Sequence, residues 1–191
     1  PVAMAAASDD TTVLVVASAP SYAHGVVDPV PEIAAAAAAR GVRCHVDGCM
    51  GGVTLTYLKR LGHDIPPWNF TVPGVTSISV DLHKYGYTAK GASVIMHRNK
   101  RLRNYQTFVT DNWLGGVYGS SGVLGTKGGG AMAAAWAVMN YLGDDGYLRL
   151  AAAARRACEQ LAAAVVAIPE LQLRAAPDAM LLAFGAADPT R

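Results

Sequence analysis

The sequence predicts an α/β protein, in which helices cover a mostly parallel sheet in a three-layer α/β/α arrangement. Three observations support this fold class. Short apolar runs of strand length alternate with alanine-rich helical patterns through the first half of the chain. The first of these runs is continuously apolar, which is typical of a strand buried on both faces of a parallel sheet. The chain has 191 residues, of which 52% are hydrophobic, and this is enough for one domain with a buried core.

The first half of the chain supplies four expected strands and the helices between them. The strands are expected at residues 12–17, 42–48, 75–81 and 91–98. Between the first two lies a helix with Asp28 as its expected N-cap, prolines in its first turn and Gly41 at its end. The pattern over residues 50–62 is helical despite its glycines, and residues 99–106 form a basic turn or a short helix.

The second half begins with a glycine-rich loop at residues 113–130 and continues with two long helical patterns. These patterns cover residues 131–141 and 147–166 and are separated by the sequence GDDG. Short strands are expected at residues 171–176 and 180–186. We therefore expect residues 1–145 to be part of a major domain. Residues 146–191 would form a long connecting helix and the start of a truncated, small α+β C-terminal domain.

Composition excludes several classes of protein. A net charge of +2 is too small to indicate binding to nucleic acid or to an anionic membrane. The three cysteines show no CxxC spacing, which favours a reducing compartment. No signal peptide and no transmembrane run is recognisable, so a soluble, cytoplasmic protein is expected, and the alanine content favours a bacterial source. The chain starts without methionine and stops after a strand-like run, which indicates a fragment of a longer polypeptide.

Residues capable of chemistry follow three of the expected strands. Functional groups of open α/β sheets gather beyond the carboxyl ends of the strands. Tyr22 follows the first strand, and the second ends with His45 and Asp47. His83 and Lys84 follow the third. An aromatic ring, a carboxylate and a lysine are therefore expected at one edge of the sheet.

Asp47 needs a partner at the end of a buried strand, because an unpaired buried carboxylate is costly. A protonated heterocycle nitrogen, a helix N-terminus or Arg43 could each supply that partner. Strand alternation places His45 and Asp47 on one face and Cys44 on the other. The pair could ligate a metal with a cysteine, but no second ligand set is recognisable and no metal is expected.

Lys84 is either a solvated surface charge or a nucleophile. It follows a buried strand directly and has His83, Tyr85 and Tyr87 as neighbours. Partial burial there would lower the pKa of Lys84 and make a neutral amine available, which could form a Schiff base with an aldehyde. A lysine together with a distant carboxylate is what a protein contributes to pyridoxal phosphate (PLP) chemistry.

The glycine-rich segment and the basic run are weaker signals. The glycines match neither phosphate-binding fingerprint, so they are interpreted as flexible turns, although their backbone amides could bind a phosphate together with Ser120, Ser121 or Thr126. The basic run at residues 98–106 is interpreted as a solvated face.

Four segments in order carry a resemblance to a known family. They are SAPSYAHGVVDPVPEIA, HVDGCMGG, GVTSISVDLHKYGYTAKGAS and RNYQTFVTDNWLGGVYGSSGVLGTKGGG. Over residues 13–146 the sequence resembles the sphingosine-1-phosphate lyase branch of the group II PLP-dependent decarboxylases. These enzymes have fold type I, so the resemblance implies that residues 1–145 belong to a PLP-binding major domain.

The resemblance also implies roles at the cofactor. Lys84 would hold PLP as a Schiff base, and Asp47 would pair with the pyridine nitrogen. His83 would contact the cofactor phosphate, and His45 would lie near the ring. Thr126 lies in the loop that this family lends to the neighbouring subunit's phosphate site, which implies a homodimer with a shared active site. Serine is more usual there.

Further roles concern the substrate. Tyr22 and Lys90 match positions linked to the substrate phosphate and to proton transfer, and His24 lies beside Tyr22. The implied reaction is retro-aldol cleavage of a phosphorylated sphingoid base into a fatty aldehyde and phosphoethanolamine. Two alternatives stay open. One is an amino acid decarboxylase that acts on glutamate or an aromatic substrate. The other is a non-catalytic fragment, because the family's main phosphate-binding loop and ring-stacking residue do not precede Pro1.

Overall fold

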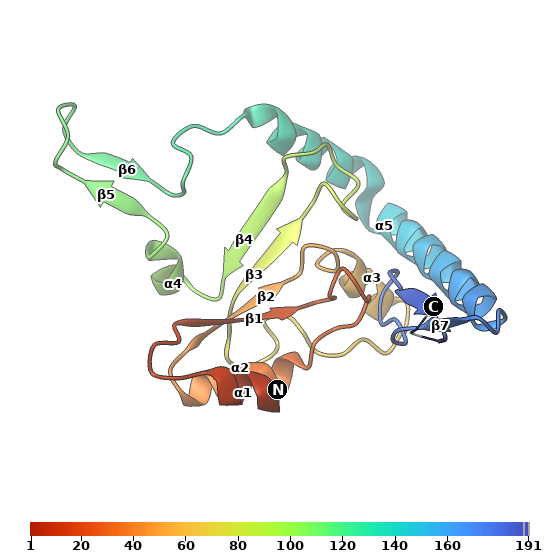
Figure 1. Ribbon diagram of the computed structural model, residues 1–191. Coiled ribbons are helices and arrows are strands. Elements are labelled where there is room, and N and C mark those ends of the chain that lie inside the picture. The colour runs from red at the N-terminus through yellow and green to blue at the C-terminus, as the bar shows by residue number, and fades with distance from the viewer. Residues whose placement is uncertain (189, 191) are drawn as a thin grey trace.

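A four-stranded mixed sheet forms the centre of the molecule. The computed structural model describes residues 1–188 and 190 (Figure 1). The strand order is β1-β2-β3-β4, in which the first three strands are parallel and β4 is antiparallel to β3. The strands are β1 Leu14–Ser18, β2 Arg43–Asp47, β3 Val75–Asp81 and β4 Ser93–His97. The expected α/β class and mostly parallel sheet are therefore confirmed.

Strand register brings Asp47 and the segment that contains Lys84 to one edge of this sheet. Ser18 at the end of β1 pairs with Asp47 at the end of β2, and Asp47 pairs with Ser79 in β3. Strand β3 continues to Asp81, which pairs with Ser93 of β4. The segment after β3, which contains Lys84, therefore leaves the sheet beside the end of β2.

Helices cover one face of the sheet. The core combines side chains of α2 (Val30–Ala39) and α3 (Thr54–Arg60) with alternate residues of the strands. Right-handed crossovers between parallel strands in the order β1-β2-β3 place both connecting helices on the same face. Helix α1 (Val2–Ala7) packs against α2 on this side. The largest fully buried side chains include Leu55, Leu58, Ile78 and Val46.

The opposite face of the sheet is open. Along β1 the side chains of Val15 and Ala17 are buried, whereas Leu14 and Val16 are each 47% exposed. The helical layer formed by α2 and α3 lies on the Val15 face, and within the described residues no equivalent layer covers the Val16 face. The described chain thus provides the sheet and one of the two helical layers that the sequence predicts.

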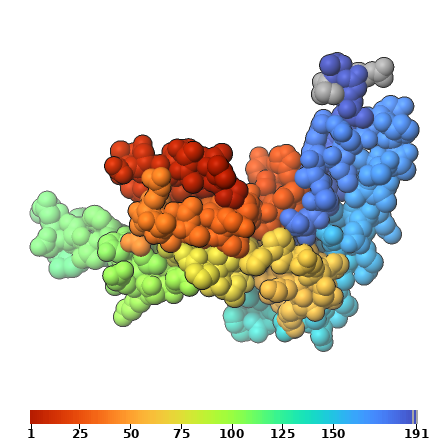
Figure 2. Space-filling view, turned by 90° about the horizontal axis from the view of Figure 1, so that it is seen from below, coloured from red at the N-terminus to blue at the C-terminus, as the bar shows by residue number. Residues whose placement is uncertain are grey.

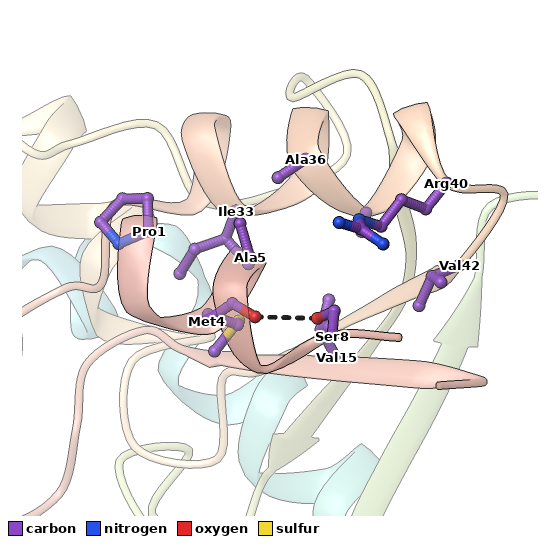
Figure 3. A pocket seen from close by; sticks show the side chains of 10 residues that line it. Pro1, Met4, Ala5, Ser8, Val15, Ile33, Ala36, Arg40 and Val42 are labelled. Atoms are coloured by element: carbon purple, nitrogen blue, oxygen red, sulfur yellow. Dashed lines mark hydrogen bonds between the residues drawn. The ribbon is translucent and has the colours of Figure 1, made fainter. Parts of the chain in front are cut away.

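A small cavity lies between α1, α2 and β1, far from the edge where Asp47 and Lys84 lie. Figure 3 shows its mainly apolar lining, which includes Met4, Val15 and Ile33. Its volume is about 10 Å³, which is no more than the space that one water molecule needs. We therefore interpret it as a packing defect and not as a ligand site.

The start of α2 differs from the expectation for Asp28. Pro29 is the N-cap, and no side chain caps the helix. The Asp28 carboxylate instead accepts the backbone N–H of Ser18 at 2.7 Å. If Asp28 were the N-cap, Pro31 would occupy the third helical position. Proline has no backbone N–H, so it could not donate the hydrogen bond that an N-cap carboxylate accepts there. The expected end of this helix is confirmed, because Gly41 has a φ of 69°.

A hairpin occupies much of the segment expected to be a loop. After the short helix α4 (Lys100–Asn104), strands β5 (Phe108–Thr110) and β6 (Tyr118–Ser120) pair antiparallel. The hairpin projects away from the sheet (Figure 1), and in Figure 2 it extends beyond the body at one end. Its large exposed apolar side chains are Phe108, Val109, Trp113, Leu114, Val117 and Tyr118.

From residue 129 onward the order of helices and strands agrees with the sequence prediction. Helix α5 (Gly129–Val166) is interrupted at Gly143, whose φ of 54° separates two helical segments as expected from GDDG. The helix packs against α3 and against β7 (Leu171–Leu173), which pairs with β8 (Phe184–Ala186). Tyr147 stacks on Tyr57 of α3 with ring centroids 5.2 Å apart. The boundary between residues 145 and 146 stays a prediction.

Gly51 allows the turn after β2 to pack closely against the end of β1. A Cβ atom at this position would meet the carbonyl oxygen of Ala19, the ring of Pro20 and the side chain of Leu55. We expect Gly51→Ala to lower the free energy of unfolding by about 1–3 kcal/mol, because backbone must move to admit the methyl group.

Denaturant unfolding would measure this effect. The matched control is Gly128→Ala, where a Cβ atom meets open space and a change under about 0.5 kcal/mol is expected. Equal free energies of unfolding for Gly51→Ala and Gly128→Ala would contradict the close packing of Gly51 against Ala19 and Pro20.

Candidate active site

His45 is held on the open face by two hydroxyl groups of β3. Its Nδ1 lies 2.8 Å from the Ser77 hydroxyl, and its Nε2 lies 3.1 Å from the Ser79 hydroxyl. A hydroxyl can donate or accept, so this arrangement fixes the plane of the ring in either tautomer. Burial lowers the pKa of His45, and the nearby charge of Asp47 partly offsets that effect. The neutral imidazole is therefore favoured.

Asp47 points to the same face and organises the turn after β2. Its Oδ1 accepts the Cys49 N–H at 2.9 Å and the Ser79 hydroxyl at 3.4 Å. The carboxylate is not the N-cap of α3, which is Val53, and no ion pair among the described residues joins it to Arg43. Of the three partners that the sequence suggested for the Asp47 carboxylate, only a protonated heterocycle nitrogen remains compatible with the described residues. Cys44 is buried on the opposite face, as strand alternation predicts.

Lys84 forms an ion pair that the sequence analysis did not anticipate. Its Nζ lies 2.8 Å from Oδ2 of Asp81, and the Cys49 thiol also lies near the amine. Burial on its own lowers the pKa of Lys84, but the interactions with Asp81 and Cys49 together raise it more strongly, so the pKa lies above its ordinary value. The expectation of a lowered pKa was therefore wrong.

His83 lies beside this ion pair. Its Nδ1 is 3.0 Å from the Ala92 carbonyl oxygen, and a carbonyl only accepts, so Nδ1 carries the proton. Its Nε2 lies 3.9 Å from the Asp81 carboxylate. The ring is thus held between the two ends of the loop that contains Lys84.

Four other expected site residues lie apart from this cluster. The side chains of Tyr22, His24, Lys90 and Thr126 are exposed. In the part of the chain that the structure describes, no hydrogen bond or ion pair connects them to Lys84 or Asp47. The structure therefore brings together Lys84, Asp47, His45 and His83, and leaves the other four on the surface.

Three polar residues of the cluster received no role from the sequence. Ser79 links His45 to Asp47, Asp81 pairs with Lys84, and Ser93 donates to Asp81 Oδ1 at 2.6 Å. Period-two alternation along β3 places Ser77, Ser79 and Asp81 on the face of His45, and this signal could have identified Ser79 and Asp81. Ser93 lies on β4 and is located only by the pairing of β4 with β3. Among the described residues, no group of three or more histidine, cysteine, aspartate or glutamate side chains could hold a metal ion.

Comparison with known proteins identifies the family. Residues 2–187 match the pyridoxal-dependent decarboxylase conserved domain. The chain belongs to the pyridoxal-dependent decarboxylase family. It is 42% identical to sphingosine-1-phosphate lyase of Dictyostelium discoideum over 182 residues, which are 95% of this chain and 34% of that protein. It is 38% identical to sphingosine-1-phosphate lyase 1 of Rattus norvegicus over 187 residues, which are 97% of this chain and 33% of the relative.

Solved structures of the family agree with this fold. The sphingosine-1-phosphate lyase of Burkholderia pseudomallei superposes with a TM-score of 0.91 at 44% identity, over 96% of this chain and 42% of that one. A glutamate decarboxylase of Lactobacillus brevis gives a TM-score of 0.77 at 20% identity, over 96% of this chain and 43% of that one. The chain spans about a third of the length of the curated relatives it matches. None of the described helices combines the length and apolar character needed to cross a membrane.

The residues of the cluster fit pyridoxal phosphate, the cofactor of this family. The Lys84 side chain is 32% exposed, so its amine is accessible to an aldehyde. Asp47 and His45 lie on the face of the sheet that the described helices leave open, where a flat ring has room. A lysine amine and a carboxylate for the pyridine nitrogen are what a protein contributes to PLP chemistry.

Proposed function

We propose that the protein containing this chain is a PLP-dependent carbon–carbon lyase. It cleaves a phosphorylated sphingoid base into a fatty aldehyde and phosphoethanolamine by retro-aldol chemistry. The observation that carries this proposal is the placement of Lys84 and Asp47 at the ends of neighbouring strands, in a sequence 42% identical to a sphingosine-1-phosphate lyase. Bound PLP supplies the aldehyde for the lysine and withdraws electrons from the substrate bond that breaks.

Three residues of the cluster serve the cofactor ring in this proposal. Lys84 supplies the amine that holds PLP covalently. Asp47 supplies a negative charge that favours a protonated ring nitrogen. His45 is neutral and fixed by Ser77 and Ser79, so it offers a rigid, flat surface near the ring. These roles need no movement of β2 or β3.

The phosphate groups call for donors, because charge-assisted hydrogen bonds are the strong ones. We assign His83 to the cofactor phosphate, and Lys90 and Tyr22 to the substrate phosphate and to proton transfer, with His24 supporting Tyr22. The side chains of Lys90, Tyr22 and His24 are exposed. A solvated lysine or tyrosine is free to turn toward a charged head group.

A second copy of the chain completes the site in this proposal. Thr126 contributes to the phosphate site of the neighbouring subunit of a homodimer. The homodimer is supported by the projecting hairpin of β5 and β6, which exposes several large apolar side chains. Exposed apolar groups that lie together commonly mark a protein–protein interface. Thr126 lies in the exposed segment that follows this hairpin.

Domain assignment and location belong to the same proposal. Residues 1–145 form part of the PLP-binding major domain, and residues 146–191 form the connecting helix and the beginning of a small C-terminal domain. The Gly143 interruption in α5 lies close to that boundary and supports it. We place the protein in the cytoplasm of a bacterium, on the basis of its cysteine usage and alanine content.

Product analysis tests the reaction. The full-length protein with PLP is expected to release a fatty aldehyde from sphingosine phosphate and no carbon dioxide from glutamate or an aromatic amino acid. A decarboxylase would use the same Lys84 and Asp47, so the products are what separates the two reactions. Carbon dioxide release without aldehyde formation would overturn the lyase assignment. Absence of both, with PLP unbound, would indicate a non-catalytic protein.

A further inference from the structure

Asp81 connects the lysine of the site to the sheet. Its Oδ2 lies 2.8 Å from Lys84 Nζ, while its Oδ1 accepts the Ser93 hydroxyl at 2.6 Å. Strand register pairs Asp81 directly with Ser93. The two oxygens therefore have separate partners, and the bond to β4 fixes the direction in which the carboxylate faces Lys84.

Both partners of this ion pair are partly buried. The side chains of Asp81 and Lys84 are 20% and 32% exposed. In the two arginine pairs of the described residues, Arg60–Asp144 and Arg155–Glu159, the carboxylate side chain is at least half exposed, at 64% and 51%. Partial burial reduces screening by water, so the carboxylate acts more strongly on the amine. The pair is also local, because its members are three positions apart along the chain.

The charged and titratable groups around Lys84 favour its protonated form. Asp81 faces the amine from β3, and Cys49 faces it from the turn after β2. Asp47 accepts the backbone N–H of Cys49, and His83 faces Asp81 from within the loop. A protonated amine has no lone pair to attack an aldehyde, so a lysine amine that is ion-paired with Asp81 is held in an unreactive form.

We infer that Asp81 is a positioning residue that holds the free Lys84 amine at the end of β3 in its protonated form. Asp81 thereby limits the rate at which Lys84 reacts with an aldehyde. The part of this inference that concerns PLP rests on the proposed function. The part that concerns amine reactivity is a property of the cofactor-free protein and can be tested without it.

Chemical labelling of the cofactor-free, full-length protein tests the inference. An amine-selective acylating reagent would be applied across a range of pH, and modification of Lys84 followed by mass spectrometry. We expect Asp81→Asn to label roughly fivefold faster at a given pH below the lysine pKa, the upper end for a partly exposed ion pair. Loss of the carboxylate lowers the pKa of Lys84, so the labelling curve moves to lower pH.

Matched variants separate this role from a structural one. The amide introduced by Asp81→Asn keeps an oxygen acceptor for Ser93, and Asp81→Glu restores a carboxylate that should return labelling toward the original rate. Asp64→Asn makes the same charge change on an exposed residue and should leave Lys84 labelling unchanged. If Asp81→Asn does not fold, Ser93→Ala provides a second test. This variant keeps the Asp81 carboxylate but removes the hydroxyl that fixes its direction, and the rate of Lys84 labelling is expected to rise about twofold.

Two results would overturn the inference. One is equal Lys84 labelling in the Asp81→Asn variant and the unaltered protein, and the other is faster labelling that Asp81→Glu fails to reverse. Stopped-flow binding of PLP should show the same acceleration in Asp81→Asn. If Lys84 labelling accelerates but PLP binding does not involve Lys84, the positioning role stands and the proposed function fails.

Discussion

Lys84→Ala is expected to eliminate covalent PLP binding and to reduce aldehyde formation by at least about a thousandfold. The methyl group cannot form a Schiff base, and loss of a covalent catalytic group typically costs several orders of magnitude in rate. Dialysis of the full-length variant against buffer should therefore remove the visible absorbance that the unaltered protein retains. Aldehyde release from sphingosine phosphate would be followed in the same preparations.

Lys84→Arg is the matched control for the local structure. Arginine keeps a positive charge for Asp81 but is effectively never neutral, so it cannot act as the nucleophile. We expect its unfolding midpoint to remain near that of the unaltered protein while its PLP absorbance and activity are lost. Lys59→Ala, which removes a lysine in the last turn of α3, should retain the PLP absorbance and the activity. A Lys84→Ala variant that kept its absorbance and activity would remove Lys84 from the mechanism.

Pattern and chain order were sufficient to place Lys84 beside Asp47. Continuous apolar runs locate parallel strands, and the carboxyl ends of parallel strands meet at one edge. The expected bounds of β3, residues 75–81, agree with the structure. Strand alternation also separated Cys44 from His45 and Asp47. These inferences depend on apolar runs and on the alternation of side chains along a strand, and both can be read from the order of the residues alone.

The protonation of Lys84 could not be obtained in this way. The sequence indicates that the lysine is partly buried, and burial alone would lower its pKa. The outcome depends on whether the loop turns the amine back toward Asp81, three residues earlier, and on the Cys49 thiol brought in from the turn after β2. Asp28 also depends on a contact from another part of the chain. Its carboxylate accepts the backbone N–H of Ser18 in β1 and therefore does not cap α2.

The hairpin of β5 and β6 was missed for a different reason. Each strand has three residues, which is too short for an alternating pattern to stand out. The glycines between and beyond them are typical of a loop. Its exposed apolar side chains become informative only when the structure shows that the segment projects from the body.

Asp47→Asn is expected to retain PLP on Lys84 but to reduce the turnover number by at least about a hundredfold. An amide carries no charge to stabilise a protonated ring nitrogen, and removing one preorganised electrostatic contact commonly costs a factor of this size. Visible absorbance should persist because Lys84 is intact. Turnover would be measured as aldehyde released from sphingosine phosphate by the full-length protein.

The choice of asparagine separates the charge of Asp47 from its structural bonds. An amide oxygen can still accept the Cys49 N–H and the Ser79 hydroxyl, so the turn after β2 should keep its geometry. Asp47→Ala loses those bonds as well and should lower the free energy of unfolding by a further 1–2 kcal/mol, roughly the cost of leaving such groups unpaired. Because both variants lack the charge, equal losses of turnover would assign the catalytic effect to that charge. Full turnover in Asp47→Asn would instead show that the carboxylate serves only the turn, and the partner of the ring nitrogen would have to be sought elsewhere.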